Sequence, residues 1–192
     1  PGVPFVVEDK KLDPLGRYAL LRGRLEGMSI VNGSLYFPNI DQHVFLTVPT
    51  ATLAEWAELP WILGGDCNAV IDPVLDRSYL PLMGSPVMRN AKALSDWLAE
   101  WSLVDVWRCH NPDAWEYSFY SHPHQVQTKL DRIMCSDLLQ TTVYHTTYIG
   151  KTFSDHNSLE VGIQWGKSPD PNTGLAKGAF HPRRAPHKGN VT

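Results

Sequence analysis

The stretch Trp61–Asn68 contains the two polar residues whose spacing most clearly suits catalysis. Its first three residues are bulky and apolar and predict a buried strand, which two glycines then connect to Asp66 and Asn68. A carboxylate and an amide this close together at a strand end can point at one spot. Such a pair suits a hydrated metal ion, an attacking water or a phosphate oxygen. A complete site needs further polar side chains from elsewhere in the chain.

Four other short segments offer such side chains. Tyr36 and Asn39 lie at the end of a predicted strand, and Ser118 lies in an aromatic segment. Asp131 follows a leucine at the start of another predicted strand. The segment Ser154-Asp155-His156 precedes the last predicted strand.

Each of these residues also has an interpretation without function. Tyr36 can be a half-buried strand residue. Asp131 can form an ion pair with Arg132 at a sheet edge. Ser154 and Asp155 can form a turn, and His156 can be a structural histidine. The individual residues therefore leave both interpretations open.

The elements that must position these residues alternate between strands and helices, which indicates an α/β fold. The expected strands cover residues 5–7, 20–25, 28–36, 61–63, 117–120, 130–135, 143–149 and 159–165. Residues 41–59 predict a helix that Pro49 should kink or split. The strongest helical pattern covers residues 90–107, and residues 71–88 are expected to form a long loop.

Length and composition indicate one folded domain with a tail. The chain has 192 residues, of which 43% are hydrophobic and 19% charged. We assign residues 1–165 to the domain and residues 166–192, which are rich in Pro, Gly and Lys, to a flexible tail. The tail is basic, whereas the whole chain has a net charge of −3. The acidic remainder can reflect metal-binding carboxylates or a solvated acidic surface.

Cysteine and histidine spacing does not predict a zinc site. Cys67, Cys109 and Cys135 are odd in number and lack CxxC spacing, which is typical of reduced thiols in an intracellular protein. His122 and His124 are interpreted as loop histidines. There is no secretory signal and no apolar run of about 18 residues. We therefore expect an intracellular protein, nuclear or cytoplasmic, with no membrane partner.

The order of the polar segments resembles the exonuclease/endonuclease/phosphatase superfamily. Gly-Asp-x-Asn is moderately specific by itself, but Ser-Asp-His about ninety residues later makes the combination strong. The sequences of these segments are most similar to the endonuclease domain of LINE-type non-LTR retrotransposons, relatives of apurinic/apyrimidinic endonucleases. The resemblance covers about residues 1–165 and rests on Ser34–Asn39, Trp61–Asn68, Tyr117–His122, Leu130–Ile133 and Phe153–Ser158.

This resemblance implies a mixed α/β fold, a four-layered sandwich of two packed mixed β-sheets flanked by helices, with the site at one end. It implies a phosphodiester hydrolase that acts on DNA with Mg²⁺ or Mn²⁺. A hard divalent cation on carboxylate oxygens would neutralise charge on the phosphate in the transition state. The resemblance further implies a monomer that was once part of a polyprotein with a reverse transcriptase.

The resemblance also implies a role for each matched residue. Asp66 would orient or deprotonate the attacking water, and Asn68 would hold that water or a phosphate oxygen. His156 would bind the scissile phosphate, and Asp131 would orient its imidazole. The phosphate would receive hydrogen bonds from Tyr36 and Ser118, and the metal would be reached by Asp155 and Asp66.

The chain departs from the family pattern in two ways. The pattern begins upstream with an Asn and with a Glu that is the principal metal ligand, whereas the match here begins just before the Tyr36 strand. Glu8 and Glu26 are poor substitutes, because they fall in an outer charged segment and in a turn. We therefore expect the first strands and the metal-ligand Glu to be missing, with open strand edges as a result. Cys67 replaces a bulky aromatic, which we expect to be a tolerated packing change.

Three functions stay open. The first is a Mg²⁺-dependent retrotransposon-type DNA endonuclease, impaired or inactive because the Glu segment is absent. The second is a catalytically silent remnant that at most binds nucleic acid through its basic tail. The third is a phosphatase of the same superfamily that acts on a phosphoinositide or nucleotide. Cleavage specificity would depend on the loops at residues 71–88 and 121–128.

Overall fold

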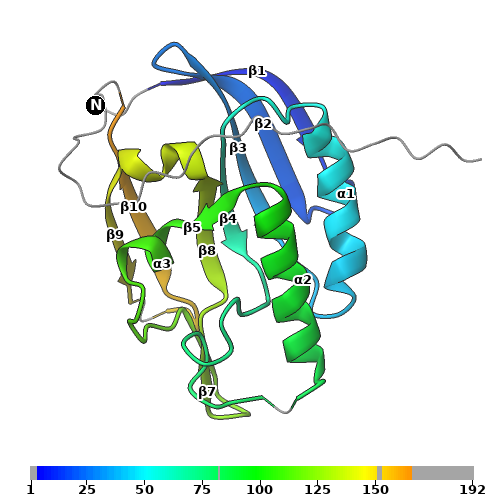
Figure 1. Cartoon of the computed structure of the whole chain (residues 1–192), viewed down its shortest axis with the longest axis vertical. Helices are drawn as coiled ribbons and strands as arrows, with labels where there is room; N and C mark the ends of the chain where they lie inside the picture. The colour runs from blue at the N-terminus through cyan, green and yellow to red at the C-terminus, as the bar shows by residue number, and fades with distance from the viewer. Residues whose placement is uncertain (1–3, 82, 151–152, 166–192) are drawn as a thin grey trace, which may run out of the picture.

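The computed structural model describes residues 4–81, 83–150 and 153–165, so the expected tail lies outside the described residues. The elements follow one another along the chain as shown in Figure 1. They are β1 (Phe5–Leu12), β2 (Tyr18–Leu25), β3 (Met28–Tyr36), α1 (Gln42–Ala54), β4 (Trp61–Asp66), α2 (Pro86–Glu100), β5 (Leu103–Asp105), α3 (Val106–His110), β6 (Phe119–Ser121), β7 (Val126–Thr128), β8 (Asp131–Ser136), the 3-10 helix η1 (Asp137–Thr142), β9 (Val143–Ile149) and β10 (Ser158–Ile163).

A six-stranded mixed sheet in the order β1-β2-β3-β4-β8-β5 forms the centre of the molecule. β3 and β4 run parallel, and the other neighbouring strands run antiparallel. Two further sheets, β10-β9 and β6-β7, have two strands each. Within the described chain, β10 therefore pairs along one edge only, with β9. The mixed α/β class expected from the sequence is confirmed.

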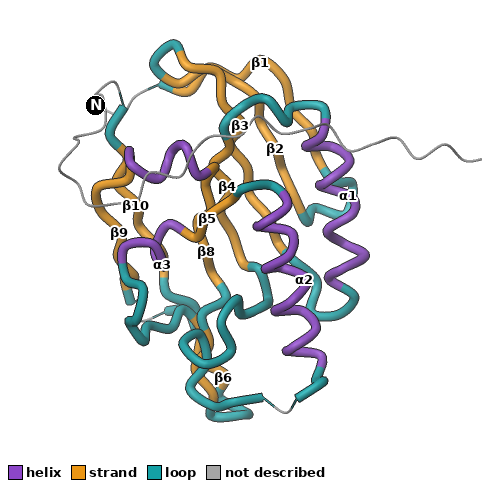
Figure 2. Tube along the Cα trace, in the orientation of Figure 1, coloured by secondary structure: helices purple, strands orange, loops and turns teal. Residues whose placement is uncertain are grey.

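The central sheet is covered differently on its two faces. Helices α1 and α2 lie over one face, as Figures 1 and 2 show, and β9 and β10 lie toward the other. Strand β4 illustrates the alternation: Trp61 and Leu63 belong to the main core, whereas Ile62 packs with the second cluster, which includes Val161 and Ile163. Both faces of β4 are thus apolar, and the strand packs between two layers.

Helix α2 differs from the helix expected over residues 90–107. It begins at Pro86, where the Ser85 side chain caps it by accepting a hydrogen bond from Met88 N at 3.4 Å. It ends at Glu100, and Ser102 then adopts a left-handed conformation with φ 48°. The apolar residues beyond that point form β5 and α3, so the expected long helix was wrong at its C-terminal end.

Two further expectations also need correction. Helix α1 continues through Pro49 to Ala54, so the proline does not split it. Buried Phe45, Leu46 and Leu53 anchor the helix on both sides of the proline. Strand β1 extends to Leu12 rather than stopping near residue 7, with a bulge between Val7 and Asp9. Its charged half is possible because β1 is an edge strand of the sheet.

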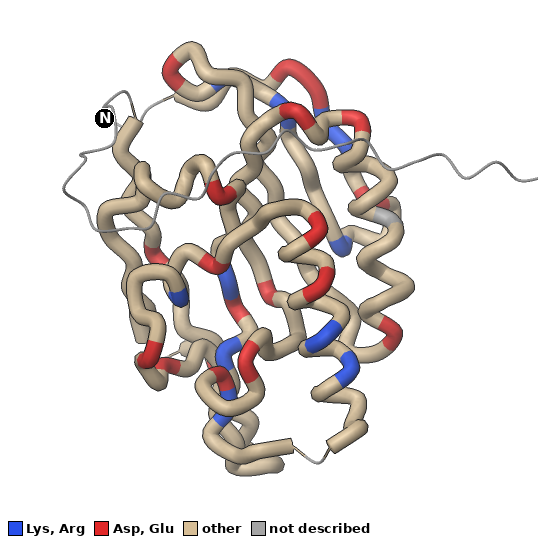
Figure 3. Tube along the Cα trace, viewed as in Figure 1, with Lys and Arg blue, Asp and Glu red and all other residues tan. Residues whose placement is uncertain are grey.

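Figure 3 shows Lys and Arg interspersed with Asp and Glu over the described chain. All three cysteines are free, as expected, and burial raises the pKa of Cys67 and of Cys135 to about 12, so both thiols are protonated. Cys67 is fully buried in the main core. Among the described residues, no helix has the length and apolar character needed to cross a membrane.

Candidate active site

Strand pairing brings three of the predicted residues to one end of the central sheet. Tyr36 is the register partner of Asp66 in the parallel pair β3–β4. Asp66 is in turn the register partner of Asp131 in the antiparallel pair β4–β8. The end of β3, the end of β4 and the start of β8 therefore lie side by side, near the loops at the lower end of Figure 2.

The end of β4 requires glycine before Asp66. Gly65 has φ 147°, and a Cβ there would lie 1.8 Å from the carbonyl oxygen of Leu35. Only glycine allows the two parallel strands to approach this closely. After Gly65, Asp66 Oδ1 accepts a hydrogen bond from Asn68 N at 2.8 Å. Asn68 itself has φ 44°, and its Nδ2 donates to Phe37 O at 2.7 Å. The donor side of this amide is thus engaged, and its Oδ1 is the side left for a ligand.

Asp66 has the electrostatic environment of a proton acceptor. Burial raises the pKa of its carboxyl above the ordinary value, and the nearby Asp131 adds to the increase. The hydrogen bond from Asn68 N and the proximity of His156 act in the opposite direction. A carboxylate with a raised pKa accepts a proton from water more readily than an ordinary one.

Asp131 and His156 form a directly bonded pair. His156 Nδ1 lies 2.7 Å from Asp131 Oδ2. Because an ionised carboxylate only accepts hydrogen bonds, Nδ1 carries the proton, and Nε2 is left to meet a ligand. The imidazole also contacts the ring of Phe119 at a centroid distance of 4.7 Å, and Tyr148 Oη donates to the Asp131 carbonyl at 2.6 Å. The interpretation that Asp131 pairs with Arg132 is therefore wrong, because these neighbours point to opposite faces of β8.

A groove lies beside the Asp131–His156 pair. Its volume is about 440 Å³, and its lining includes Gly64, Gly65, Asp131, Ile133, His156 and Leu159. The pair is therefore accessible from outside the protein, with His156 only partly covered.

Ser118 supports Asp131 from inside the protein. Its side chain is fully buried, and its Oγ accepts hydrogen bonds from Leu130 N and Asp131 N, both at 2.9 Å. Its backbone carbonyl accepts from Asn157 N at 2.7 Å. Ser118 thus joins the β8 start to the segment that carries His156, whereas a direct contact with phosphate stays a prediction.

A buried ionic network, which the sequence did not reveal, lies next to Asp131. Arg132 Nη2 lies 2.8 Å from Asp76 Oδ2, and Arg132 Nη1 also pairs with Asp105. Lys129 pairs with the same Asp105 carboxylate. Arg132, Lys129, Asp76 and Asp105 are all buried. The two cations that flank the Leu130-Asp131 dipeptide are therefore both anchored in the interior.

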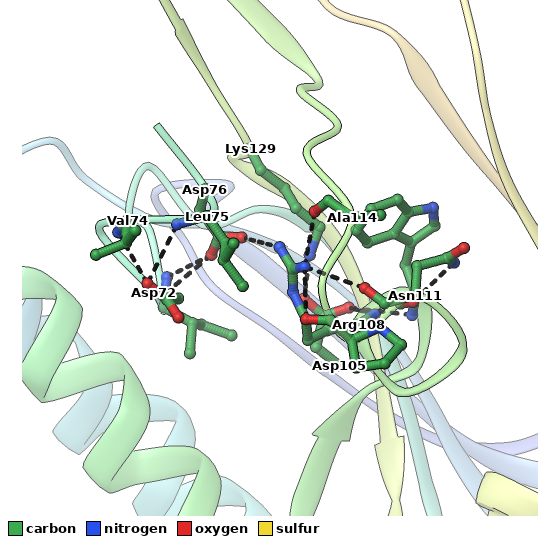
Figure 4. Close-up of polar contacts among 12 residues, drawn as sticks. Asp72, Val74, Leu75, Asp76, Asp105, Arg108, Asn111, Ala114 and Lys129 are labelled. Carbon is green, nitrogen blue, oxygen red and sulfur yellow. Dashed lines mark hydrogen bonds and ion pairs between the residues drawn. The ribbon is translucent and has the colours of Figure 1, made fainter. Parts of the chain in front are cut away.

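Arg108 extends this network to the neighbouring loops, as Figure 4 shows. Its Nη2 lies 2.6 Å from Asp76 Oδ1, and its Nη1 donates to the carbonyls of Asn111, Pro112 and Ala114. Asp76 Oδ2 also accepts hydrogen bonds from Ile71 N and Asp72 N, both at 3.0 Å. One carboxylate thus ties the loop after Asn68 to the start of β8.

The charges and the burial of the network lower the pKa values of its two carboxylates and of Lys129. Burial would raise the pKa of Asp76, but Arg132 and Lys129 outweigh burial and hold it well below the ordinary value. The pKa of Asp105 is likewise lowered, because Lys129 and Arg132 outweigh its burial. Burial and the neighbouring Arg132 lower the pKa of Lys129 to about 8. At neutral pH, Lys129 therefore stays mostly protonated and both carboxylates are ionised.

Comparison with known proteins shows the family of the chain. The family model described as "Endonuclease/Exonuclease/phosphatase family" matches residues 6–156. The chain belongs to this endonuclease/exonuclease/phosphatase family. A Xenopus laevis protein, the Transposon TX1 uncharacterized 149 kDa protein, is 35% identical over 104 residues, which are 52% of this chain and 7% of that protein. The chain therefore spans a small part of that relative's length.

Solved structures show the same fold at low sequence identity. The AP endonuclease LMAP from Leishmania major has a TM-score of 0.67 and 18% identity, over 79% of this chain and 55% of that chain. The endonuclease domain of TRAS1, a telomere-specific non-LTR retrotransposon, has a TM-score of 0.60 and 17% identity, over 83% and 70%. The 3′ phosphatase NExo from Neisseria, bound to product DNA hairpin, has a TM-score of 0.64 and 14% identity, over 84% and 72%.

The residues described in this family member do not form a complete metal site. Within residues 4–81, 83–150 and 153–165, no three His, Cys, Asp or Glu side chains converge as metal ligands. Asp155 is exposed, and its backbone carbonyl accepts a hydrogen bond from Tyr120 N at 3.2 Å. Glu8 pairs with Arg24 on β1–β2, and Glu26 lies in the following turn; that neither replaces the missing ligand stays a prediction. The metal roles of Asp66 and Asp155 therefore stay predictions.

Proposed function

We propose that this chain is a phosphodiester hydrolase of the retrotransposon DNA endonuclease type. The observation that carries the proposal is the Asp131–His156 contact of 2.7 Å, formed next to the register pair of Asp66 and Asp131. It combines a carboxylate suited to activate water with an oriented imidazole, and these are two of the groups that in-line displacement at phosphorus needs.

Each side chain has a definite task in this proposal. Asp66 takes the proton of the attacking water, helped by its raised pKa. Asn68 Oδ1 orients that water. His156 Nε2–H donates to a phosphate oxygen and stabilises the charge that grows there, and it requires the doubly protonated ring to do so. Asp131 accepts from Nδ1–H and thereby holds the ring in orientation for this contact. Tyr36, which is about half exposed, supplies a further donor.

DNA is the proposed substrate. Its phosphates suit an imidazole and a phenol at the end of the sheet, and two relatives described above are a retrotransposon endonuclease and an enzyme bound to DNA. Mg²⁺ or Mn²⁺ is the proposed cofactor by family membership, although no cluster of three ligands forms among the described residues. We expect activity to rise up to high metal concentrations without early saturation.

The test is nicking of supercoiled plasmid over a titration of Mg²⁺ and Mn²⁺. Asp66→Ala is compared with Asp96→Ala, an exposed acid on α2 that serves as matched control. We expect nicking by the unmodified chain, a loss of about 100-fold or more in Asp66→Ala, and no loss in Asp96→Ala. Absence of nicking at every metal concentration would reject the endonuclease function.

A catalytically silent, nucleic-acid-binding remnant is the second candidate. It is favoured by the lack of a metal-ligand cluster among the described residues. In that case, a salt-dependent affinity for DNA should persist without cleavage and should decline when residues 166–192 are removed. The phosphatase alternative is tested in the same reactions by the release of phosphate from a 3′-phosphorylated oligonucleotide and from inositol phosphates.

A further inference from the structure

Gln42, the first residue of α1, contacts the loop that carries Asn68. Its side chain is fully buried, and its Nε2 lies 2.9 Å from Pro38 O, 2.9 Å from Cys67 O and 3.0 Å from Asn68 O. The opposite amide orientation is unfavourable, because it would place Oε1 against three carbonyl oxygens. A single side-chain NH₂ group therefore joins the loop after β3 to the loop after β4.

The two carbonyls on the Asn68 side belong to consecutive peptide groups. Cys67 O precedes the Asn68 Cα and Asn68 O follows it, so the pair of bonds fixes both peptide planes around that atom. Consecutive carbonyls alternate in direction along a strand and point the same way only in helix-like conformations. Asn68 has such a conformation in its left-handed form, with φ 44°. Asparagine tolerates this left-handed backbone better than most residues, and the two bonds from Gln42 fix it further.

The other end of the Gln42 amide makes no hydrogen bond. Gln42 Oε1 is buried and has no hydrogen-bond partner among the described residues. A methionine of similar shape would avoid this unpartnered acceptor, but it would leave the three carbonyls without their donor. The contribution of Gln42 is therefore its donor group, which acts on the backbone of Asn68.

We propose that Gln42 is a positioning residue that holds Asn68 in its left-handed backbone and thereby aims the Asn68 side chain at the attacking water. With φ fixed, Asn68 Nδ2 reaches Phe37 O and Oδ1 turns to the ligand side. The conformational part stands independently, and only the catalytic consequence rests on the proposed function.

The first experiment determines the φ angle of Asn68 in Gln42→Met by crystallography or NMR. The control is Thr50→Val, which removes a hydrogen-bonding side chain from the same helix, where Thr50 Oγ1 donates to Leu46 O and accepts from Trp97 Nε1. We expect Asn68 to leave positive φ in Gln42→Met and to keep it in Thr50→Val. Positive φ with the Phe37 contact intact in Gln42→Met would overturn the proposal.

A second comparison covers the case in which Gln42→Met does not fold. Glycine adopts positive φ without strain, so an Asn68→Gly background should need the Gln42 donor less. We expect Gln42→Met to lower the unfolding midpoint less in that background than in the parent chain, or to fold only there. An equal decrease, or failure to fold in both backgrounds, would contradict the proposal.

Single-turnover nicking then tests the catalytic consequence. Gln42→Met should lower the maximal rate about 100-fold with little change in the protein concentration that gives half of it, because the reacting groups are misplaced rather than lost. The effects of Gln42→Met and Asn68→Ala should not add, because both act through one amide. Additive effects would show that Gln42 acts elsewhere. If the unmodified chain nicks no DNA, the proposed function fails, whereas the Asn68 backbone still decides the role of Gln42.

Discussion

The two sides of the site are held in place by different forces. The β8 side, which consists of Lys129, Asp131 and Arg132, rests on buried ion pairs to Asp76 and Asp105. The β4 loop, which consists of Asp66, Cys67 and Asn68, is held mainly by neutral hydrogen bonds from Gln42 and to Phe37. Breaking a buried ion pair affects stability far more than losing one neutral hydrogen bond. We therefore expect changes on the β8 side to unfold the protein and changes in the β4 loop to disturb mainly its chemistry.

The largest expected effect is the loss of a network carboxylate. Asp76→Asn leaves Arg132 and Arg108 without their full partner in the interior, so the free energy of unfolding should fall by about 3–5 kcal/mol. Urea unfolding at neutral pH measures this change. Asp96→Asn, which removes an exposed partner of Lys92, is the control and should change stability by less than about 0.5 kcal/mol. Equal effects of the two variants would remove the basis of the comparison.

The same ion pairs predict a response to acid. The folded-state pKa values of Asp76 and Asp105 lie below the unfolded value of about 3.9, so their stabilising contribution is fully present above that pH. It is lost as the pH falls through the folded-state values. Stability should therefore decline more steeply below about pH 4 in the parent chain than in Asp76→Asn. Denaturant unfolding at a series of pH values tests this, and parallel curves would contradict it.

Ser118 should give an intermediate effect, because it supports the β8 side by neutral bonds. Ser118→Ala leaves the amides of Leu130 and Asp131 without their acceptor and should lower stability by about 2 kcal/mol. Thermal unfolding compares it with Ser95→Ala, an exposed serine on α2. An effect as small as that of Ser95→Ala would mean that Ser118 does not hold Asp131.

The smallest effect on stability is expected in the β4 loop. Asn68→Ala removes the contact with Phe37 O and should lower stability by about 1 kcal/mol, yet lower the nicking rate about 100-fold or more. Unfolding and nicking are measured on the same preparation. A large loss of stability with an unchanged rate would reverse the assignment of the two sides.

The sequence predicted the candidate catalytic residues better than the residues that hold them in place. Asp66, Asp131 and His156 were found because they end or begin clear strands in a recognisable order. Asp76, Asp105 and Gln42 were missed, because their partners lie 24 to 56 residues away and a buried charge has no local signature. Adjacency was misleading for Asp131 and Arg132, which point to opposite faces of one strand.

The elements show the same limit. Strands with both faces buried, such as β4, were predicted from their apolar runs. The end of α2 was missed, because Ser102 reverses the chain with a positive φ that no glycine announces. Its beginning had a usable signal in Ser85-Pro86, a cap followed by proline. Local patterns thus identified the elements, and tertiary contacts determined several of their ends.

The role of the Asp131-bonded His156 in cleavage is the central claim, and plasmid nicking by His156→Ala tests it most directly. The matched control is His145→Ala, an exposed histidine on β9. We predict that the parent chain and His145→Ala nick at rates within about twofold of each other, and that His156→Ala nicks about 100-fold more slowly or not at all. Equal nicking by the two histidine variants would contradict the assignment of this site.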